Sequence, residues 1–152
     1  MMSINMKDVR AQLDPDEPDY AEAAKLGPDA IPFLKELVNG KDTMLASKAA
    51  YLASLIKSDR SVSVLEAAAG SREPVVRIAA ASGIRNLSEQ DASRVSDLLI
   101  EDQDTGVRKV TLKSISNFRS PGLVAKVKKL ADKDPEPFIR DLASSTVRRM
   151  MK

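Results

Sequence analysis

One short pattern recurs along the sequence at an almost constant interval. Glu73-Pro-Val-Val-Arg77 starts with an acid and ends four residues later with an arginine, and the pattern returns as Asp104-Thr-Gly-Val-Arg108 and Glu136-Pro-Phe-Ile-Arg140. An upstream copy, Asp42-Thr-Met-Leu-Ala46, lacks the arginine. The leading acids are separated by 31, 31 and 32 residues. A fixed period of this size is typical of chains built from repeated supersecondary units.

Each unit is predicted to contain a first helix, a tight turn, the acidic pattern and a second helix. Aligned positions keep the period: Leu37, Ala68, Leu99 and Leu130 in the first helices, and the small residues Ala49, Ala80, Thr111 and Ala143 in the second. Aromatic residues form only 3% of the chain, which favours closely packed helices over a β core. The first helices are expected over residues 28–39, 60–70, 89–101 and 120–132, and the second over 43–57, 74–87, 105–118 and 136–150.

The segment before the first unit reads as a cap. A helix is predicted over residues 4–13, with Ser3 as its N-cap, and a second over 20–26, ended by Gly27. Two prolines break the chain between them. The same stretch holds four acids, but it lacks the order and central glycine of an EF-hand, so a solvated turn is favoured over a cation site. Those acids are Asp14, Asp16, Glu17 and Asp19.

The segment Leu26-Gly-Pro-Asp-Ala-Ile-Pro-Phe-Leu34, followed by patterns of the form acid, x, x, apolar, Arg, resembles HEAT repeats, especially the short units of phycobilisome lyase-type proteins. The resemblance covers about residues 26–151. It implies an all-α fold: a right-handed α-solenoid, or α-α superhelix, of about four HEAT-like helical pairs with a short N-terminal helical cap. The single domain, 1–152, would divide into a cap at 1–27 and repeats at 28–57, 58–88, 89–119 and 120–151. Ala46 and an extra residue in Asp134-Pro-Glu-Pro137 depart from the pattern, in the first and last units.

The acidic pattern itself is interpreted as structural. An acid suits the N-terminus of a helix, and an arginine one turn later can pair with it or bridge to the next repeat. The resemblance implies the bridging arrangement, an inter-repeat ladder. Its expected members are Asp42, Glu73, Arg77, Asp104, Arg108, Glu136 and Arg140.

Composition narrows the feasible chemistry. The chain has no Cys and no His, which removes thiolate sites and the commonest metal ligand and general base. It also lacks a phosphate-binding loop, a dinucleotide fingerprint and a nucleophile elbow. We therefore expect no enzyme activity, no metal and no cofactor. No apolar run approaches the length of a membrane span and no signal sequence is present, so a soluble, cytoplasmic protein is expected.

Charge is distributed unevenly along the chain. Residues 1–104 hold 12 Lys/Arg and 18 Asp/Glu, whereas residues 105–152 hold 12 and 4. The resemblance to HEAT repeats implies that the second helices line the concave side of the solenoid, where their exposed positions would form a binding surface. The candidates are Tyr51, Arg85, Lys109, Lys113, Arg119 and Arg148. We expect them to bind an acidic segment of a partner protein, with Arg85 and Arg148 as carboxylate-binding forks.

The favoured function is thus a non-enzymatic protein-binding adaptor, and two alternatives stay open. One is nucleic-acid binding through Lys109, Lys113, Arg119, Lys126, Lys128, Lys129, Arg148 and Arg149, although stacking aromatics are scarce. The other, implied only by the resemblance, is an accessory role in a tetrapyrrole (phycobilin) lyase system. The last helix is apolar around much of its circumference, so a homodimer or a partner contact through it is a further expectation. Its apolar residues are Phe138, Ile139, Leu142, Ala143, Val147, Met150 and Met151.

Overall fold

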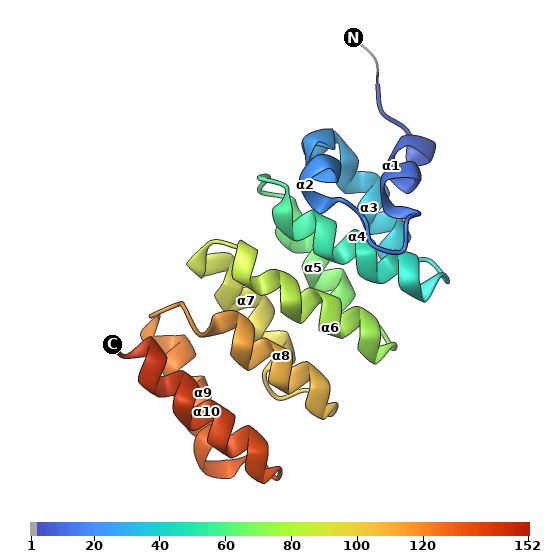
Figure 1. Cartoon of the computed structure of the whole chain (residues 1–152). Helices are drawn as coiled ribbons and strands as arrows, with labels where there is room; N and C mark the ends of the chain where they lie inside the picture. Colours follow the sequence, from blue (N-terminus) through green and yellow to red (C-terminus); the bar gives the residue numbers. More distant parts are fainter. Residues whose placement is uncertain (1–2) are drawn as a thin grey trace.

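The computed structural model describes residues 3–152, which form helices stacked in pairs (Figure 1). No strand occurs in this range, so the all-α prediction is confirmed. The α-helices are α1 (Met6–Leu13), α2 (Tyr20–Ala23), α3 (Ile31–Val38), α4 (Thr43–Leu55), α5 (Ser61–Ala69), α6 (Pro74–Gly83), α7 (Glu89–Leu99), α8 (Thr105–Ile115), α9 (Pro121–Lys133) and α10 (Pro137–Met150). Short 3₁₀ turns are η1 (Ala24–Leu26), η2 (Pro28–Ala30) and η3 (Ile84–Asn86).

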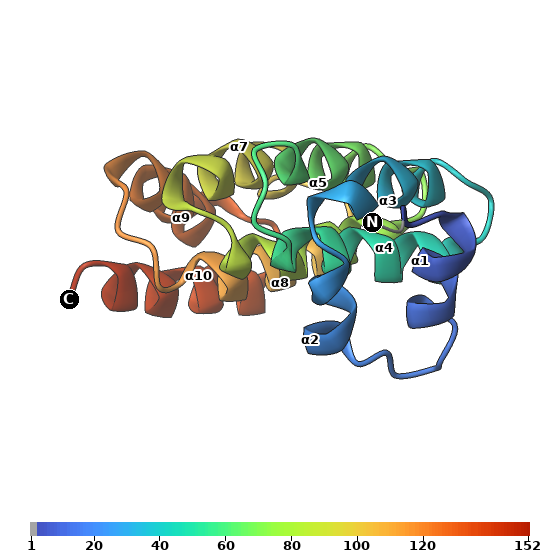
Figure 2. The same cartoon turned by 90° about the horizontal axis from the view of Figure 1, so that it is seen from above.

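The pairs form an α-solenoid with two layers. Figure 2 shows α3, α5, α7 and α9 on one side, here named the first-helix layer, and α4, α6, α8 and α10 on the other, the second-helix layer. Each helix packs on the next of its own layer, as α4 does on α6 and α6 on α8. The aligned small residues Ala49, Ala80, Thr111 and Ala143 are fully buried in the second-helix layer. They let neighbouring helices approach closely, as their recurrence predicted.

Helices α4 and α6 lie close together at Gly83. A Cβ atom built on Gly83 would lie 2.8 Å from Cβ of Ser54 and 3.1 Å from Cδ2 of Leu65. Because real Cβ atoms do not come so near to other carbons, only glycine fits here without a shift of the helices. The side chain of Ser54 is in turn held by Asn86 of η3, whose Nδ2 donates to the serine Oγ at 3.0 Å.

An acidic residue is the N-cap of each of the four second helices. Asp42 and Asp104 are side-chain N-caps: their carboxylates accept from the backbone N–H of Leu45 at 3.0 Å and of Val107 at 3.1 Å. Glu73 and Glu136 occupy the same position before α6 and α10, each followed by a proline. Proline is well suited to the first turn because its missing N–H has no intrahelical partner there. The repeated acid therefore marks where each second helix begins.

The N-cap expected at Ser3 is wrong by two residues. Asn5 caps α1, accepting from the N–H of Asp8 at 3.0 Å, while the Asp8 carboxylate accepts from the Asn5 N–H at 2.9 Å. This is a reciprocal capping box. The pairing of Asn5 with Asp8 starts the helix at Met6 and leaves Ser3 exposed before it.

Helices α1 and α2 cover the N-terminal end of the stack (Figure 1). Lys48 of α4 holds them there, because its Nζ donates to the backbone oxygens of Leu13 at 3.0 Å and Pro15 at 2.8 Å. Tyr20 of α2 packs edge-on against Tyr51 of α4, with ring centroids 5.0 Å apart. Partial burial, and to a lesser extent Tyr51, raises the pKa of Tyr20.

Across residues 3–152, none of the helices combines the length and the apolar character that crossing a membrane requires.

Candidate functional site

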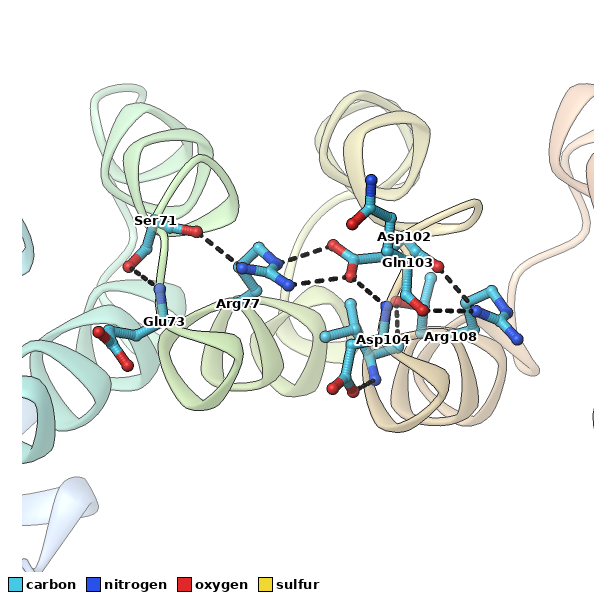
Figure 3. Close-up of polar contacts among 9 residues, drawn as sticks. Ser71, Glu73, Arg77, Asp102, Gln103, Asp104 and Arg108 are labelled. Carbon is cyan, nitrogen blue, oxygen red and sulfur yellow. Dashed lines mark hydrogen bonds and ion pairs between the residues drawn. The ribbon is translucent and has the colours of Figure 1, made fainter.

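Two arginines of the second-helix layer bridge successive repeats. Arg77 of α6 holds Asp102 in the next unit (Figure 3), with Nε–Oδ2 and Nη2–Oδ1 distances of 2.8 and 3.2 Å. Arg108 of α8 holds Asp134 in the same way, at 2.8 and 3.1 Å. Each contact is a bidentate, charge-assisted pair, which is the strongest form of protein hydrogen bond. The two contacts join the second, third and fourth units.

The acid in each bridge differs from the one that the sequence pattern suggested. Arg77 and Arg108 do not pair with Glu73, Asp104 or Glu136 but with aspartates two residues ahead of the pattern. Asp104 uses its carboxylate to cap α8, whereas Asp102 lies in the loop before it, opposite the preceding arginine. Asp102 Oδ1 also accepts from the Asp104 N–H at 2.9 Å, and Asp134 repeats this bond with Glu136 at 3.0 Å. The repeat alignment holds the missed signal, a column of Gly40, Ser71, Asp102 and Asp134.

The first two units lack the arginine–aspartate pair that joins the later units. Ala46 stands at the arginine position and Ser71 at the aspartate position, so both partners are replaced together and neither leaves an unpaired charge. A hollow of about 520 Å³ lies there, lined by both residues. Ser71 keeps the local part of the pattern, since its Oγ accepts from the Glu73 N–H at 3.1 Å and its backbone oxygen from Arg77 Nη1 at 2.9 Å.

Ion pairs also cross the first-helix layer. Glu66 pairs with Arg94 at 3.0 Å, Asp97 with Lys126, and Glu101 with Lys129 at 2.8 Å. Each pair links one unit to the next, from a first helix or, for Glu101, from the turn directly after α7. The basic set considered for nucleic acid is therefore divided: Lys126, Lys128 and Lys129 lie on α9 in the first-helix layer, and two of the three are paired with acids.

A basic hollow of about 580 Å³ lies where α8 and α10 end. It is lined by Ser116, Asn117, Arg119, Ser145, Arg148, Arg149 and Lys152. An adjoining hollow of about 410 Å³ shares Ser116, Ser145 and Arg149 and adds Lys113, Leu142 and Thr146. Among the described residues that line the two hollows, five are cationic and none is acidic.

Two local contacts shape the basic hollow. Arg149 Nε donates to Asn117 Oδ1 at 3.2 Å, which ties the end of α10 to the end of α8. The backbone N–H groups of Arg119 and Ser120 both donate to one carboxylate oxygen of Glu89, each at 2.7 Å. This acid orders the segment that leads out of α8. Cations are also favoured at the carbonyl ends of helices. The cationic side chains that line the hollows can therefore both stabilise the ends of α8 and α10 and bind an anionic ligand.

The structure gathers only part of the predicted binding set. Lys113, Arg119 and Arg148 meet around the two hollows. Arg85 is exposed one unit away, where its Nε donates to the Ser82 oxygen at 3.1 Å and its Nη2 to Ser114 Oγ at 3.4 Å. Lys109 is exposed on α8, outside the lining residues.

Tyr51 does not belong to this surface. It is half-buried under Tyr20, because α2 packs over the second-helix layer of the first unit. Sequence reasoning also missed the hollow's polar members Asn117 and Lys152. Asn117 and Arg149 are 32 residues apart, one period of the last unit, and that spacing was the signal for their contact.

No group of three or more potential ligand side chains arranged around a metal position is found in residues 3–152. At the other end of the chain, Phe138 and Met151 of the last repeat are 49% and 62% exposed, whereas Ile139, Ala143 and Met150 are buried. The apolar residues of α10 are thus shared between the core and the surface.

Comparison with known proteins places this architecture in a family. The family model for HEAT repeats matches residues 66–148, more than half of the chain. The chain belongs to the HEAT-repeat family. Its fold is similar to a chain in the solved complex of CpcE and CpcF of phycocyanin lyase from Nostoc sp. PCC7120, with a TM-score of 0.69 and 20% identity over 93% of this chain and 96% of that one. No curated protein matches it in sequence.

Proposed function

We propose that this HEAT-repeat chain is a non-enzymatic scaffold that binds an acidic segment of a partner protein in the basic hollow. The observation that carries the proposal is the lining of the two adjoining hollows, with five cationic side chains and no acidic one among the described residues. Arginine forks suit carboxylates, and Ser116, Asn117 and Ser145 add neutral hydrogen-bonding groups beside them.

Two further observations support a binding role. The sequence has no His and no Cys, and two of its arginines with little exposed surface, Arg77 and Arg108, are engaged in joining repeats. The similar solved structure is described as a complex of two proteins, CpcE and CpcF. A repeat protein with an acid-free basic hollow therefore fits a scaffold better than a catalyst.

Charge reversal at the hollow tests the proposal. A fluorescently labelled peptide rich in Asp and Glu is titrated with the parent chain, with a variant carrying Arg119→Glu and Arg148→Glu, and with a control carrying Lys35→Glu and Lys128→Glu. The control makes the same charge change on exposed residues of the first-helix layer. We expect at least about tenfold weaker binding for the hollow variant alone, because the two reversals replace two attractions with two repulsions and a total of about 1.4 kcal/mol gives this factor. Equal weakening in both variants would mean that only net charge matters.

Nucleic acid is the competing ligand for the same hollow, because phosphate suits arginine as well as carboxylate does. Single-stranded DNA added as competitor distinguishes the two. DNA that displaces the peptide and binds with a steep salt dependence would assign the hollow to phosphate instead.

A second candidate function is an accessory role in a tetrapyrrole lyase system. It is favoured only by the likeness to a chain of the phycocyanin lyase complex. Absorbance and fluorescence of a free bilin on titration with the chain test it, and an unchanged spectrum removes this candidate.

A further inference from the structure

Arg140 is the third arginine of the repeated pattern. It makes the same backbone hydrogen bond as Arg77 and Arg108, but among the described residues no acidic side chain pairs with it. In all three, Nη1 donates to the backbone oxygen six residues earlier: Arg77 to Ser71 at 2.9 Å, Arg108 to Asp102 at 2.8 Å, and Arg140 to Asp134 at 2.6 Å. In the first two, Nε and Nη2 then face the next unit and hold an aspartate. Within residues 3–152, no carboxylate lies within ion-pair distance of Arg140.

Arg140 lies on a face of α10 that is covered in the other second helices. The corresponding positions are Ala46, Ala50 and Ala53 in α4; Arg77 and Ala81 in α6, with Ile84 in η3 directly after it; and Arg108, Leu112 and Ile115 in α8. All of these are buried except Arg77, whose side chain is 16% exposed. The same positions in α10, Arg140, Ser144 and Val147, are half-buried. We call these three residues, together with the exposed Met151, the outward face of α10.

We propose that the outward face of α10 docks a helix from a different protein, whose start is preceded by an aspartate that Arg140 grips. The two arginine–aspartate pairs inside the solenoid indicate which side chain the docked helix must carry. In both, the group held by the arginine is an aspartate two residues before a helix N-cap, with its Oδ1 also bound to the N-cap N–H. Ser144, Val147 and Met151 offer this helix a mostly apolar seam beside the charged fork.

A second copy of this chain does not carry the required acid. At the aligned positions of its first two units it has Gly40 and Ser71, which have no carboxylate. Its Asp102 and Asp134 are already bound to Arg77 and Arg108. Its N-terminal end, which a head-to-tail stack would use, is covered by α1 and α2 (Figure 1). A helix of another protein that carries a free aspartate before its start meets these requirements.

This surface is separate from the basic hollow and does not depend on the function proposed above. Arg140 is in the first turn of α10, whereas Arg148, Arg149 and Lys152 lie at its other end. Loss of one contact therefore leaves the other measurable.

The test uses the full chain and a synthetic helix as the probe. The probe has the sequence of residues 134–150 and is kept helical by a covalent link that replaces Asp141 and Ser145, which are exposed and one turn apart. The readout is the ¹H–¹⁵N signal of the Arg140 Nε–H group, whose frequency depends on what the guanidinium binds. We expect a saturable shift of this signal, and at least about tenfold weaker binding for a probe carrying Asp134→Asn, because a charge-assisted contact exceeds the 1.4 kcal/mol equivalent to that factor.

Protein variants complete the experiment. Arg140→Ala removes the fork and Arg140→Lys keeps only the charge, so both are expected to weaken probe binding. Lys128→Ala, which removes an exposed cation of α9 in the first-helix layer, is the matched control and should bind the probe as the parent does. Three results would overturn the proposal: no shift at millimolar probe, equal affinity for the Asp134→Asn probe, or self-association of the parent chain in sedimentation that Arg140→Ala abolishes. The last result would identify the occupant as a second copy.

Discussion

Replacing Arg108 by alanine should destabilise the whole solenoid. Arg108 and Asp134 are 7% and 6% exposed, so their pair is removed from water. The arginine also donates to the backbone oxygen of Asp102 at 2.8 Å. Its removal leaves the Asp134 carboxylate buried with the Glu136 N–H as its remaining donor. Breaking a buried ion pair from one side costs about 3–5 kcal/mol, and we expect Arg108→Ala to fall in that range.

The destabilisation expected for Arg108→Ala can be compared with that for Arg77→Ala and Arg140→Ala. Arg77 and Asp102 have side chains 16% and 9% exposed, against 8% and 3% for Arg108 and Asp134, so Arg77→Ala should cost less. Arg140→Ala removes one backbone hydrogen bond without breaking a pair, which is worth about 1 kcal/mol. The expected order of destabilisation is therefore Arg108, then Arg77, then Arg140.

Urea unfolding followed by circular dichroism at the helix band measures these differences. With a slope of about 1–3 kcal/mol per molar urea, Arg108→Ala should lower the unfolding midpoint by about 1 M or more. The double variant with Asp134→Ala should be less destabilised than the sum of the single changes, since the second change removes the unpaired charge. Binding of the acidic peptide in the basic hollow should be unaffected. An Arg108→Ala midpoint within error of the parent, or strictly additive single changes, would refute the role assigned to the pair.

Three further changes test other parts of the fold, each by urea unfolding. Ala46→Arg and Ser71→Asp should each lower stability, because each adds a charge without its partner. The two changes together should recover stability by forming the arginine–aspartate pair that is missing between the first two units. No recovery would show that the 520 Å³ hollow cannot hold this pair. Gly83→Ala should lower the free energy of unfolding by about 1–3 kcal/mol, because the added methyl group overpacks against Ser54. Adding Ser54→Gly should recover part of this loss. A Gly83→Ala variant as stable as the parent would contradict the close approach of α4 and α6. The raised pKa of Tyr20 stabilises the fold below about pH 10, and this contribution is lost as pH rises through the shifted value, so Tyr20→Phe should flatten the alkaline loss; an unchanged profile would contradict this.

Local chemistry predicted the repeat and its helices. The period of the acidic pattern located the units, and proline with a preceding acid marked the start of α6 and α10. These features succeed because helix starts and amphipathic faces depend on residues within a few positions of one another. The family resemblance followed from the same local pattern.

Contacts between units were decided only in three dimensions. Arg77 has Glu73 four residues before it in sequence, yet it binds Asp102, because the next repeat presents that carboxylate to its outward fork while Glu73 remains at the helix start. Tyr51 reads as an exposed position of α4 until α2 is seen to cover it. The basic hollow joins residues from the ends of α8 and α10, about one period apart. A one-dimensional pattern carries the spacing of such residues but not the direction of their side chains, and that direction follows from how each helical pair packs on the next.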